Sequence, residues 1–187
     1  MKKWIEQIDK TTHNFHESFG ALNSEELNWK PKSETWSIAQ NIDHLIVINS
    51  TYFPIVEALR KGKYKAPFLS KIGFVVSFCG KTVLKAVQPD RKKKIKTFPI
   101  WEPAKSEIPK GILERLKNHQ LELKEMINQS KDLVNKGVII SSPANKNIVY
   151  KLEMAFEIIV AHEQRHYEQA KEAYQLLKRE ADRQKSI

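Results

Sequence analysis

Residues 155–177 read AFEIIVAHEQRHYEQAKEAYQLL, and apolar side chains recur along them at the spacing of an amphipathic helix. Extended in both directions, this spacing predicts one long helix from about Asn147 to Arg183. Its apolar stripe comprises Ile148, Leu152, Ala155, Phe156, Ile159, Ala170, Ala173 and Leu177. His162 and His166 fall in the same stripe, and residues four apart share one helix face. The sequence therefore places two imidazole rings side by side among core positions.

Three further segments have the same periodicity, and together they predict an all-α protein. They are residues 2–20, residues 35–60 and residues 106–134. Thr35 or Ser37 would cap the second segment, and Pro54 would bend it or end it early. The best strand candidates, residues 95–100 and 138–140, are too short to carry a sheet. A four-helix bundle is the expected architecture.

Length and composition indicate a single globular domain over residues 1–187. A hydrophobic content of 41% with 29% charged residues excludes a disordered chain. The single cysteine, Cys79, excludes an internal disulfide framework and a cysteine-based zinc knuckle. It suits a reducing compartment, and no apolar run approaches the length of a membrane helix or a signal peptide. We therefore expect a cytoplasmic protein.

The net charge of +10 is confined to one part of the chain. Residues 61–111 carry 13 basic and 3 acidic groups, whereas residues 1–60 carry a net charge of −2 and residues 112–187 one of +2. We therefore expect a basic segment at about residues 63–108, inserted as a long connection between the second and third helices of the bundle. Phe68 to Val87 has helical spacing within it, which predicts a short amphipathic helix or helix pair.

The basic connection leaves two interpretations open. Its basic residues, beside Phe74, Val75 and Phe78, could form a patch for a membrane surface or a nucleic acid. Those residues are Lys81, Lys85, Arg91, Lys92, Lys93, Lys94 and Lys96. The favoured interpretation is a solvated connection, because a run of charges is most often just that.

His44 repeats the intrusion of an imidazole into an apolar stripe, here on the predicted second helix. If the second and fourth helices are neighbours, His44, His162 and His166 can bind one divalent ion, with a position left open for water or substrate. The alternative is that His44 is an ordinary hydrogen-bonded core histidine. Imidazole suits several transition metals, and zinc or nickel is favoured here.

Residues 162–166, HEQRH, also match the H-E-x-x-H pattern of zinc metalloproteases. Such an enzyme needs a third ligand further along the chain, and no histidine follows His166. Glu163 is also rotated by about 100° from His162 on a helix. The protease interpretation is therefore the minor one.

Two stretches together resemble signatures of the DinB-like (DNA-damage-inducible) superfamily. Residues 36–45, WSIAQNIDHL, resemble its second-helix signature, and residues 161–169, AHEQRHYEQ, resemble its fourth-helix signature. The resemblance implies a four-helix bundle of up-down-down-up topology with one longer connection. It also implies that the family's metal ligands correspond to His44, His162 and His166, and that the protein forms a homodimer.

The resemblance further implies a metal-dependent hydrolase or a thiol S-transferase that uses a low-molecular-weight thiol. In this hypothesis the ion lowers the pKa of a thiol or a water molecule. Gln169, Glu163 or Asn41 would orient a ligand imidazole, and basic groups at residues 81–96 would hold an anionic small-molecule substrate. The alternative is a non-catalytic metal-binding protein of the stress response.

Overall fold

The computed structural model describes residues 1–90 and 97–185, and most of this length is helical. The helices are α1 (Lys2–Phe19), α2 (Ser24–Asn28), α3 (Ile38–Ser50), α4 (Phe53–Arg60), α5 (Gly73–Ala86), α6 (Ile112–Gln129), α7 (Lys131–Asn135) and α8 (Leu152–Lys185). The remaining elements are two 3-10 turns, η1 (Phe68–Lys71) and η2 (Pro99–Trp101), and two strands, β1 (Ile139–Ser142) and β2 (Asn145–Lys151). The expectation of a mainly helical protein is confirmed.

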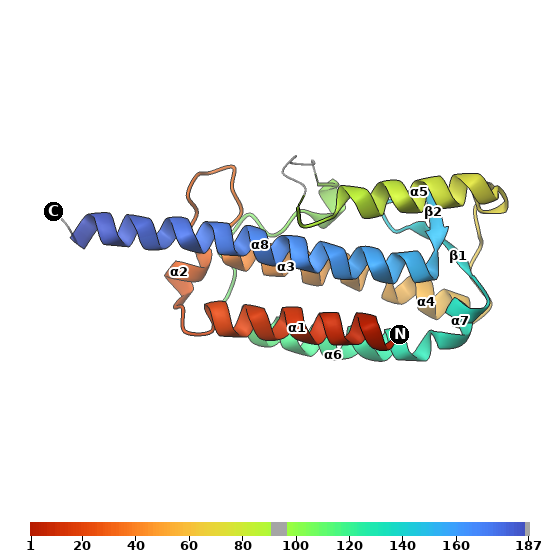
Figure 1. The fold of residues 1–187 in the computed structure, drawn as a ribbon, viewed down its shortest axis with the longest axis horizontal. Coiled ribbons are helices and arrows are strands. Elements are labelled where there is room, and N and C mark those ends of the chain that lie inside the picture. The colour runs from red at the N-terminus through yellow and green to blue at the C-terminus, as the bar shows by residue number, and fades with distance from the viewer. Residues whose placement is uncertain (91–96, 186–187) are drawn as a thin grey trace.

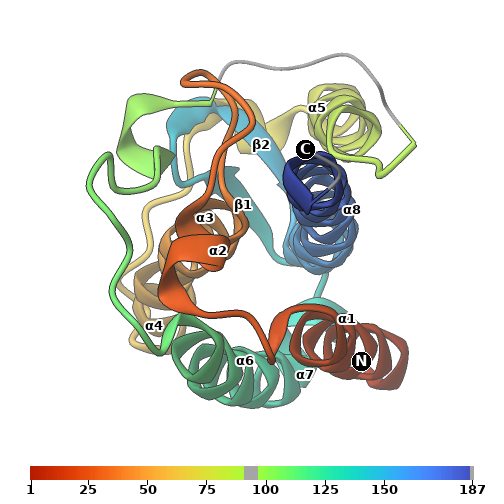
Figure 2. The ribbon, with the colours of Figure 1, turned by 90° about the vertical axis from the view of Figure 1, so that its left-hand side faces the viewer.

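Four long helices lie side by side along the long axis of the molecule (Figure 1). Helix α8 contacts both α1 and α3, and α6 contacts the same two helices from the other side. Seen along the long axis, α1, α3, α6 and α8 surround a common interior (Figure 2). Helix α5 lies outside this group, against α8 and β2.

Two clusters of fully buried side chains fill the interior. The first includes Trp4, Ile8, Leu123 and Phe156, and the Trp4 and Phe156 rings meet edge to face at 5.4 Å between centroids. The second gathers at the other end of the helices around Phe15, Phe19, Ile42, Leu116 and Ala170. The predicted apolar stripes therefore face one another, as amphipathic helices require to remove apolar surface from water.

The sequence sets both ends of α3. Ser37 caps the helix, because its side-chain oxygen accepts the backbone N–H of Gln40 at 3.1 Å and the Gln40 side chain accepts the N–H of Ser37 at 3.3 Å. The helix ends at Ser50, and Pro54 lies in the first turn of the next helix, α4. A missing N–H is harmless there, so the expected early end is confirmed.

Two predicted helix starts were wrong. Residues 145–151 form β2, which pairs with β1 in an antiparallel hairpin, so α8 begins at Leu152 and not near Asn147. Val149 and Tyr150 are buried in this hairpin, and both residue types suit a strand. Helix α6 begins at Ile112, because the backbone N–H and C=O of Ile108 are both hydrogen-bonded to the Asn28 side chain.

The connection at residues 63–108 contains the expected amphipathic helix, α5. Its inner side is narrow at Gly80, where an added Cβ would lie 2.9 Å from Met154 Cγ on α8. The basic residues Arg91–Lys94 and Lys96, and the first part of the strand candidate 95–100, lie outside the described residues. The last two residues of that candidate, 99 and 100, belong to η2.

Among the helices within residues 1–90 and 97–185, none is both long and apolar enough to cross a bilayer.

We predict that Ser37→Ala lowers the free energy of unfolding by about 1 kcal/mol, because it removes the cap of α3. Urea unfolding measures the change. Ser33→Ala, in the exposed loop before α3, is the matched control and should change the free energy little. Equal losses in the two variants would contradict the capping argument.

Candidate metal centre

Three histidines from two helices meet in the interior between α3 and α8. His162 Nε2 lies 2.9 Å from His166 Nε2 and 3.4 Å from His44 Nε2. One nitrogen of each ring lies within 4.8 Å of the others, and all three side chains are buried. The structure therefore brings together the three residues that the sequence singled out, and this histidine triad could hold a metal ion.

His166 is oriented by Asn41, one turn before His44 on α3. The Nδ1–H of His166 donates to Asn41 Oδ1 at 2.8 Å. Asn41 is itself fixed, because its Nδ2 donates to the Ser37 backbone oxygen at 2.9 Å. Since the amide oxygen can only accept, the proton of a neutral His166 ring sits on Nδ1, and Nε2 presents a lone pair.

His44 is oriented by the backbone of the basic connection. Its Nδ1–H donates to the Trp101 carbonyl oxygen at 2.5 Å, so its Nε2 also presents a lone pair. The segment that carries this carbonyl is clamped to α3 three residues later. There Asp43 Oδ2 accepts the backbone N–H of Ala104 at 3.3 Å, and the Gln40 side chain donates to the Ala104 oxygen at 2.8 Å.

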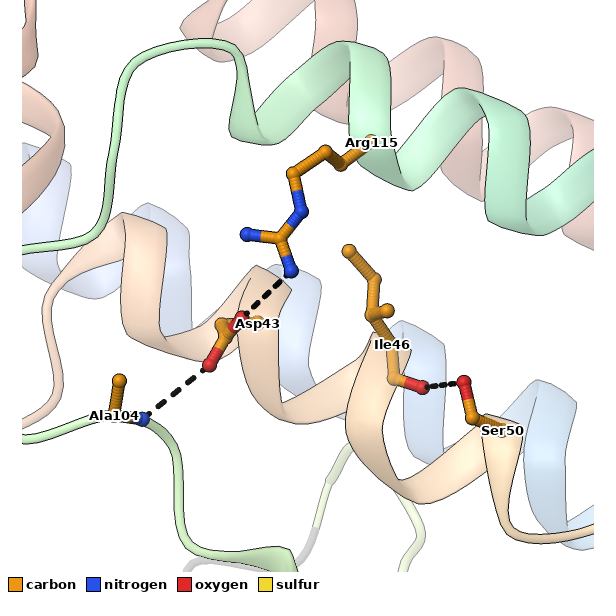
Figure 3. A network of polar contacts seen from close by, with 5 residues as sticks. All are labelled: Asp43, Ile46, Ser50, Ala104 and Arg115. Carbon is orange, nitrogen blue, oxygen red and sulfur yellow. Dashed lines mark hydrogen bonds and ion pairs between the residues drawn. The ribbon is translucent and has the colours of Figure 1, made fainter.

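Asp43 also joins the clamp to α6. Its other carboxylate oxygen, Oδ1, accepts from Arg115 Nη2 at 3.3 Å, so one side chain connects α3, α6 and the segment after η2 (Figure 3). Asp43 is buried whereas Arg115 is half-exposed, and an ion pair of this kind contributes little stability by itself. Its effect is to fix the position of the segment that orients His44.

The triad carries no charge near neutral pH. Burial lowers the pKa of all three rings, and for His162 and His166 the neighbouring imidazoles and Arg165 lower it further. The Nε2 atoms of His44 and His166 both offer lone pairs, and His162 Nε2 can donate to only one of them. At least one buried Nε2 lone pair is therefore left without a hydrogen-bond donor, whereas a cation would be coordinated by one nitrogen of each of the three rings.

Trp36 packs against the triad on the side of His44 and His166. Its ring is stacked on His166, at 5.7 Å between centroids and 21° between planes, and lies 4.8 Å from the centre of His44. Trp36 itself is only half-buried. It therefore separates part of the triad from solvent while remaining accessible.

Glu163 points away from the triad. Its Oε1 accepts from Asn49 Nδ2 at 2.8 Å on α3 and from Gln120 Nε2 at 2.9 Å on α6, and the side chain is fully buried. Burial raises the pKa of this carboxyl to about 7, against the opposing effect of the two hydrogen bonds. Glu163 thus ties α8 to two other helices, which is not the position of a metalloprotease base.

The remaining candidate from the sequence, Gln169, lies outside the triad, and so does a further buried histidine, His119. Gln169 is half-buried on the following turn of α8 and has no hydrogen bond to the triad in the described part of the chain. His119 is buried on α6 against Phe53, with ring centroids 5.6 Å apart. Sequence reasoning missed the Trp101 carbonyl, because a backbone oxygen has no signal of its own in a sequence, and it missed Trp36, whose stacking is visible only in three dimensions.

We predict that Glu163→Gln makes stability less dependent on pH. The carboxyl pKa of about 7 in the folded protein exceeds the ordinary value of 4.5. The folded state therefore binds more protons than the unfolded state in this window, and stability falls as pH rises through it. The variant keeps an oxygen for Asn49 and Gln120, so above pH 7 it should be more stable than the wild type by about 3 kcal/mol.

Urea unfolding of both proteins at a series of pH values measures this difference, and the titration of the histidines cancels because both proteins have them. Glu153→Gln, which removes an exposed carboxylate from the same helix, is the control and should not reproduce the gain. A variant less stable than the wild type at every pH would contradict the prediction.

Comparison with known proteins is consistent with this geometry. A search of the curated proteins and a search of the solved structures each found no match. The family model of the DinB superfamily matches residues 7–170, a stretch that includes all three histidines together with Asn41, Asp43 and Trp101. This match covers most of the chain, so the protein belongs to the DinB superfamily.

Proposed function

We propose that this protein is a metal-dependent enzyme, either a thiol S-transferase or a hydrolase. The observation that carries the proposal is the convergence of three uncharged imidazoles, two of them held by oxygen acceptors at Nδ1 so that their Nε2 lone pairs face inward. We further propose that α1, α3, α6 and α8 are the up-down-down-up four-helix bundle expected for this family, within one domain spanning the chain.

His44, His162 and His166 would bind the ion, with zinc or nickel favoured because imidazole suits both. A bound ion would lower the pKa of a thiol or a water molecule beside it. The chain's own contribution is orientation: Asn41 fixes the His166 ring, the Trp101 carbonyl fixes the His44 ring, and the Asp43 clamp holds Trp101 in place. Loss of a supporting group of this kind typically lowers metal affinity by about 10- to 100-fold.

The proposed substrate is a small electrophilic molecule, with a low-molecular-weight thiol as cosubstrate in the transferase case. Of the basic groups at residues 81–96 that were expected to hold an anionic substrate, Lys81 and Lys85 lie on the exposed side of α5, so the basic groups after Lys85 would take this role. This is supported by Arg165, the residue before His166, whose Nη1 donates to the Gln88 carbonyl at 3.0 Å. The end of the α5 segment therefore lies next to the part of α8 that carries the triad.

A non-catalytic metal-binding protein, as in a stress response, is the second candidate. Burial of all three rings and the packing of Trp36 over two of them favour it. A catalytic ion needs an open position that substrate can reach, whereas an ion held for storage or structure does not. Both candidate functions use the same three histidines as metal ligands, but only the enzyme would convert a substrate.

We predict that the purified protein binds about one divalent ion per chain and that His162→Ala abolishes this binding, since two imidazoles leave the ion too few ligands. Elemental analysis after dialysis against zinc or nickel measures the stoichiometry. His119→Ala removes another buried imidazole, outside the triad, and should retain the metal. Equal, near-zero stoichiometry in wild type and His162→Ala would refute the metal centre.

We predict that the metal-loaded protein consumes a thiol in the presence of chloro- or epoxide-type electrophiles, and that His162→Ala lowers the rate by at least about a hundredfold. The assay follows loss of free thiol, with glutathione, bacillithiol and mycothiol tested in turn. The hydrolase case is tested in parallel with esters and amides. A metal-loaded protein without activity in any of these assays would favour the non-catalytic candidate.

A further inference from the structure

Helix α5 has an outer face that the rest of the described protein leaves uncovered. Phe74 and Phe78 are 77% and 69% exposed, and Lys81 and Lys85 follow them. These positions are spaced by four, three and four residues, so all four side chains lie on one side of the helix. The opposite side carries Val76 and Gly80, both buried.

The turn before α5 extends this outer face. Phe68 on η1 is 73% exposed, η1 contacts α5, and the Lys71 ammonium lies 5.9 Å from the centre of the Phe68 ring. We call the resulting surface the α5 face; it consists of Phe68, Lys71, Phe74, Phe78, Lys81 and Lys85. Single exposed phenylalanines are common, but three of them at the turn and helix of one segment point to a partner.

The charge of this segment is strongly one-sided. Residues 61–90 contain six lysines and a single acidic residue, Asp90. Across residues 1–90 and 97–185, Lys71, Lys81 and Lys85 have no carboxylate partner within ion-pair distance. The partner that fits the α5 face must therefore be both apolar and anionic.

We propose that the α5 face binds the surface of an anionic lipid bilayer. In this arrangement α5 lies in the plane of the interface, the phenylalanine rings enter the boundary between headgroups and acyl chains, and the lysines contact anionic headgroups. Lysine suits this position because its methylene stem lies along apolar groups while its ammonium stays in the polar layer. The protein would be peripheral.

The placement of α5 supports this role. It lies at the outside of the group formed by α1, α3, α6 and α8 (Figure 2). It packs against β2 and α8, and its Gly80 lies close to the side chains of Met154 on α8 and Tyr150 on β2. The helix is thus fixed in the folded protein, and binding would not require it to fold first.

The charge and the exposed phenylalanines of the α5 face disfavour two other partners, a second copy of the chain and a nucleic acid. In a homodimer through α5, two surfaces with the same excess of lysine would face each other, with Asp90 the only acidic residue of the segment to offset them. A nucleic acid would satisfy the lysines but would leave the phenylalanines of the α5 face exposed unless its bases were unpaired. A bilayer satisfies both kinds of side chain.

Vesicle flotation with the full chain tests the proposal. The protein should float with phosphatidylcholine vesicles that contain about 30 mol% phosphatidylglycerol and should not float with pure phosphatidylcholine. Binding should weaken as salt is raised. Flotation does not depend on a bound metal. A negative flotation result therefore does not contradict the proposed enzyme activity, and absence of enzyme activity does not contradict the proposed membrane binding by the α5 face.

Paired variants separate this face from general effects of hydrophobicity and charge. Phe74→Ser with Phe78→Ser, and Lys81→Glu with Lys85→Glu, should each lower the partition coefficient by about tenfold or more. Leu121→Ser with Leu176→Ser removes two exposed apolar side chains elsewhere, and Lys3→Glu with Lys10→Glu makes the same charge change on α1. Both control pairs should bind like wild type.

Three results would overturn the proposal. The first is absence of flotation with anionic vesicles. The second is an equal loss in the control pairs. The third is a result in which Phe74→Ser with Phe78→Ser floats like wild type but sediments as a monomer while the wild type sediments as a dimer. The α5 face would then join two copies of the chain. Circular dichroism confirms that each variant is folded before it is scored.

Discussion

The requirement to place imidazoles inside an apolar core governs the centre of this molecule. His162 and His166 lie on one face of α8, among residues that pack against α3, and both are buried there. Burying such groups is unfavourable unless each finds partners. The neighbouring helix supplies them, because Asn41 accepts from His166 and His44 completes the group of three. The interface between α3 and α8 therefore combines polar contacts among buried side chains with apolar packing.

The connection between α4 and α6 also contributes hydrogen bonds to this interface. The Trp101 carbonyl orients His44, and the backbone groups of Ala104 are held by Asp43 and Gln40 of the same helix. Asp43 and His44 are adjacent in sequence, yet they act on the connection at points three residues apart. The basic connection is thus part of the site's framework, although no side chain from its described residues, 61–90 and 97–111, belongs to the histidine triad.

Much of this arrangement follows from local rules. Periodicity located α1, α3, α6 and most of α8, and Ser37 and Pro54 marked the ends of α3. That the second and fourth predicted helices are neighbours was a condition of the shared histidine site, and the contact of α3 with α8 meets it. The hairpin at residues 139–151 did not follow, because Ile148 and Leu152 fit a helical stripe as well as they fit a strand followed by a helix. Pairing with Ile139–Ser142 decides between these, and that contact is not local.

The histidine triad was predictable from the sequence, whereas the side chains that surround it were less so. The i, i+4 spacing of His162 and His166 fixes their common face, but the direction of Glu163 depends on Asn49 and Gln120, which come from two other helices. The amphipathic helix expected within residues 68–87 is α5, in which Val76 is buried while Phe74 and Phe78 are exposed. What its buried side packs against could not be predicted, because the contacts of Gly80 with Met154 and Tyr150 are not local.

The positive charge of the chain is separated in the structure from the helices that carry the histidine triad. The helices that carry the histidine triad come from the parts of the chain with little net charge, and the excess of +10 belongs to the segment that contains α5 and the Trp101 carbonyl. That segment touches the centre through backbone oxygens, Gln88 to Arg165 and Trp101 to His44, while its lysines on α5 are exposed. Backbone contacts do not depend on which side chains the segment carries. Its outer surface can therefore change without altering the orientation of His44, so the proposed metal chemistry and the proposed membrane contact are separable within one domain.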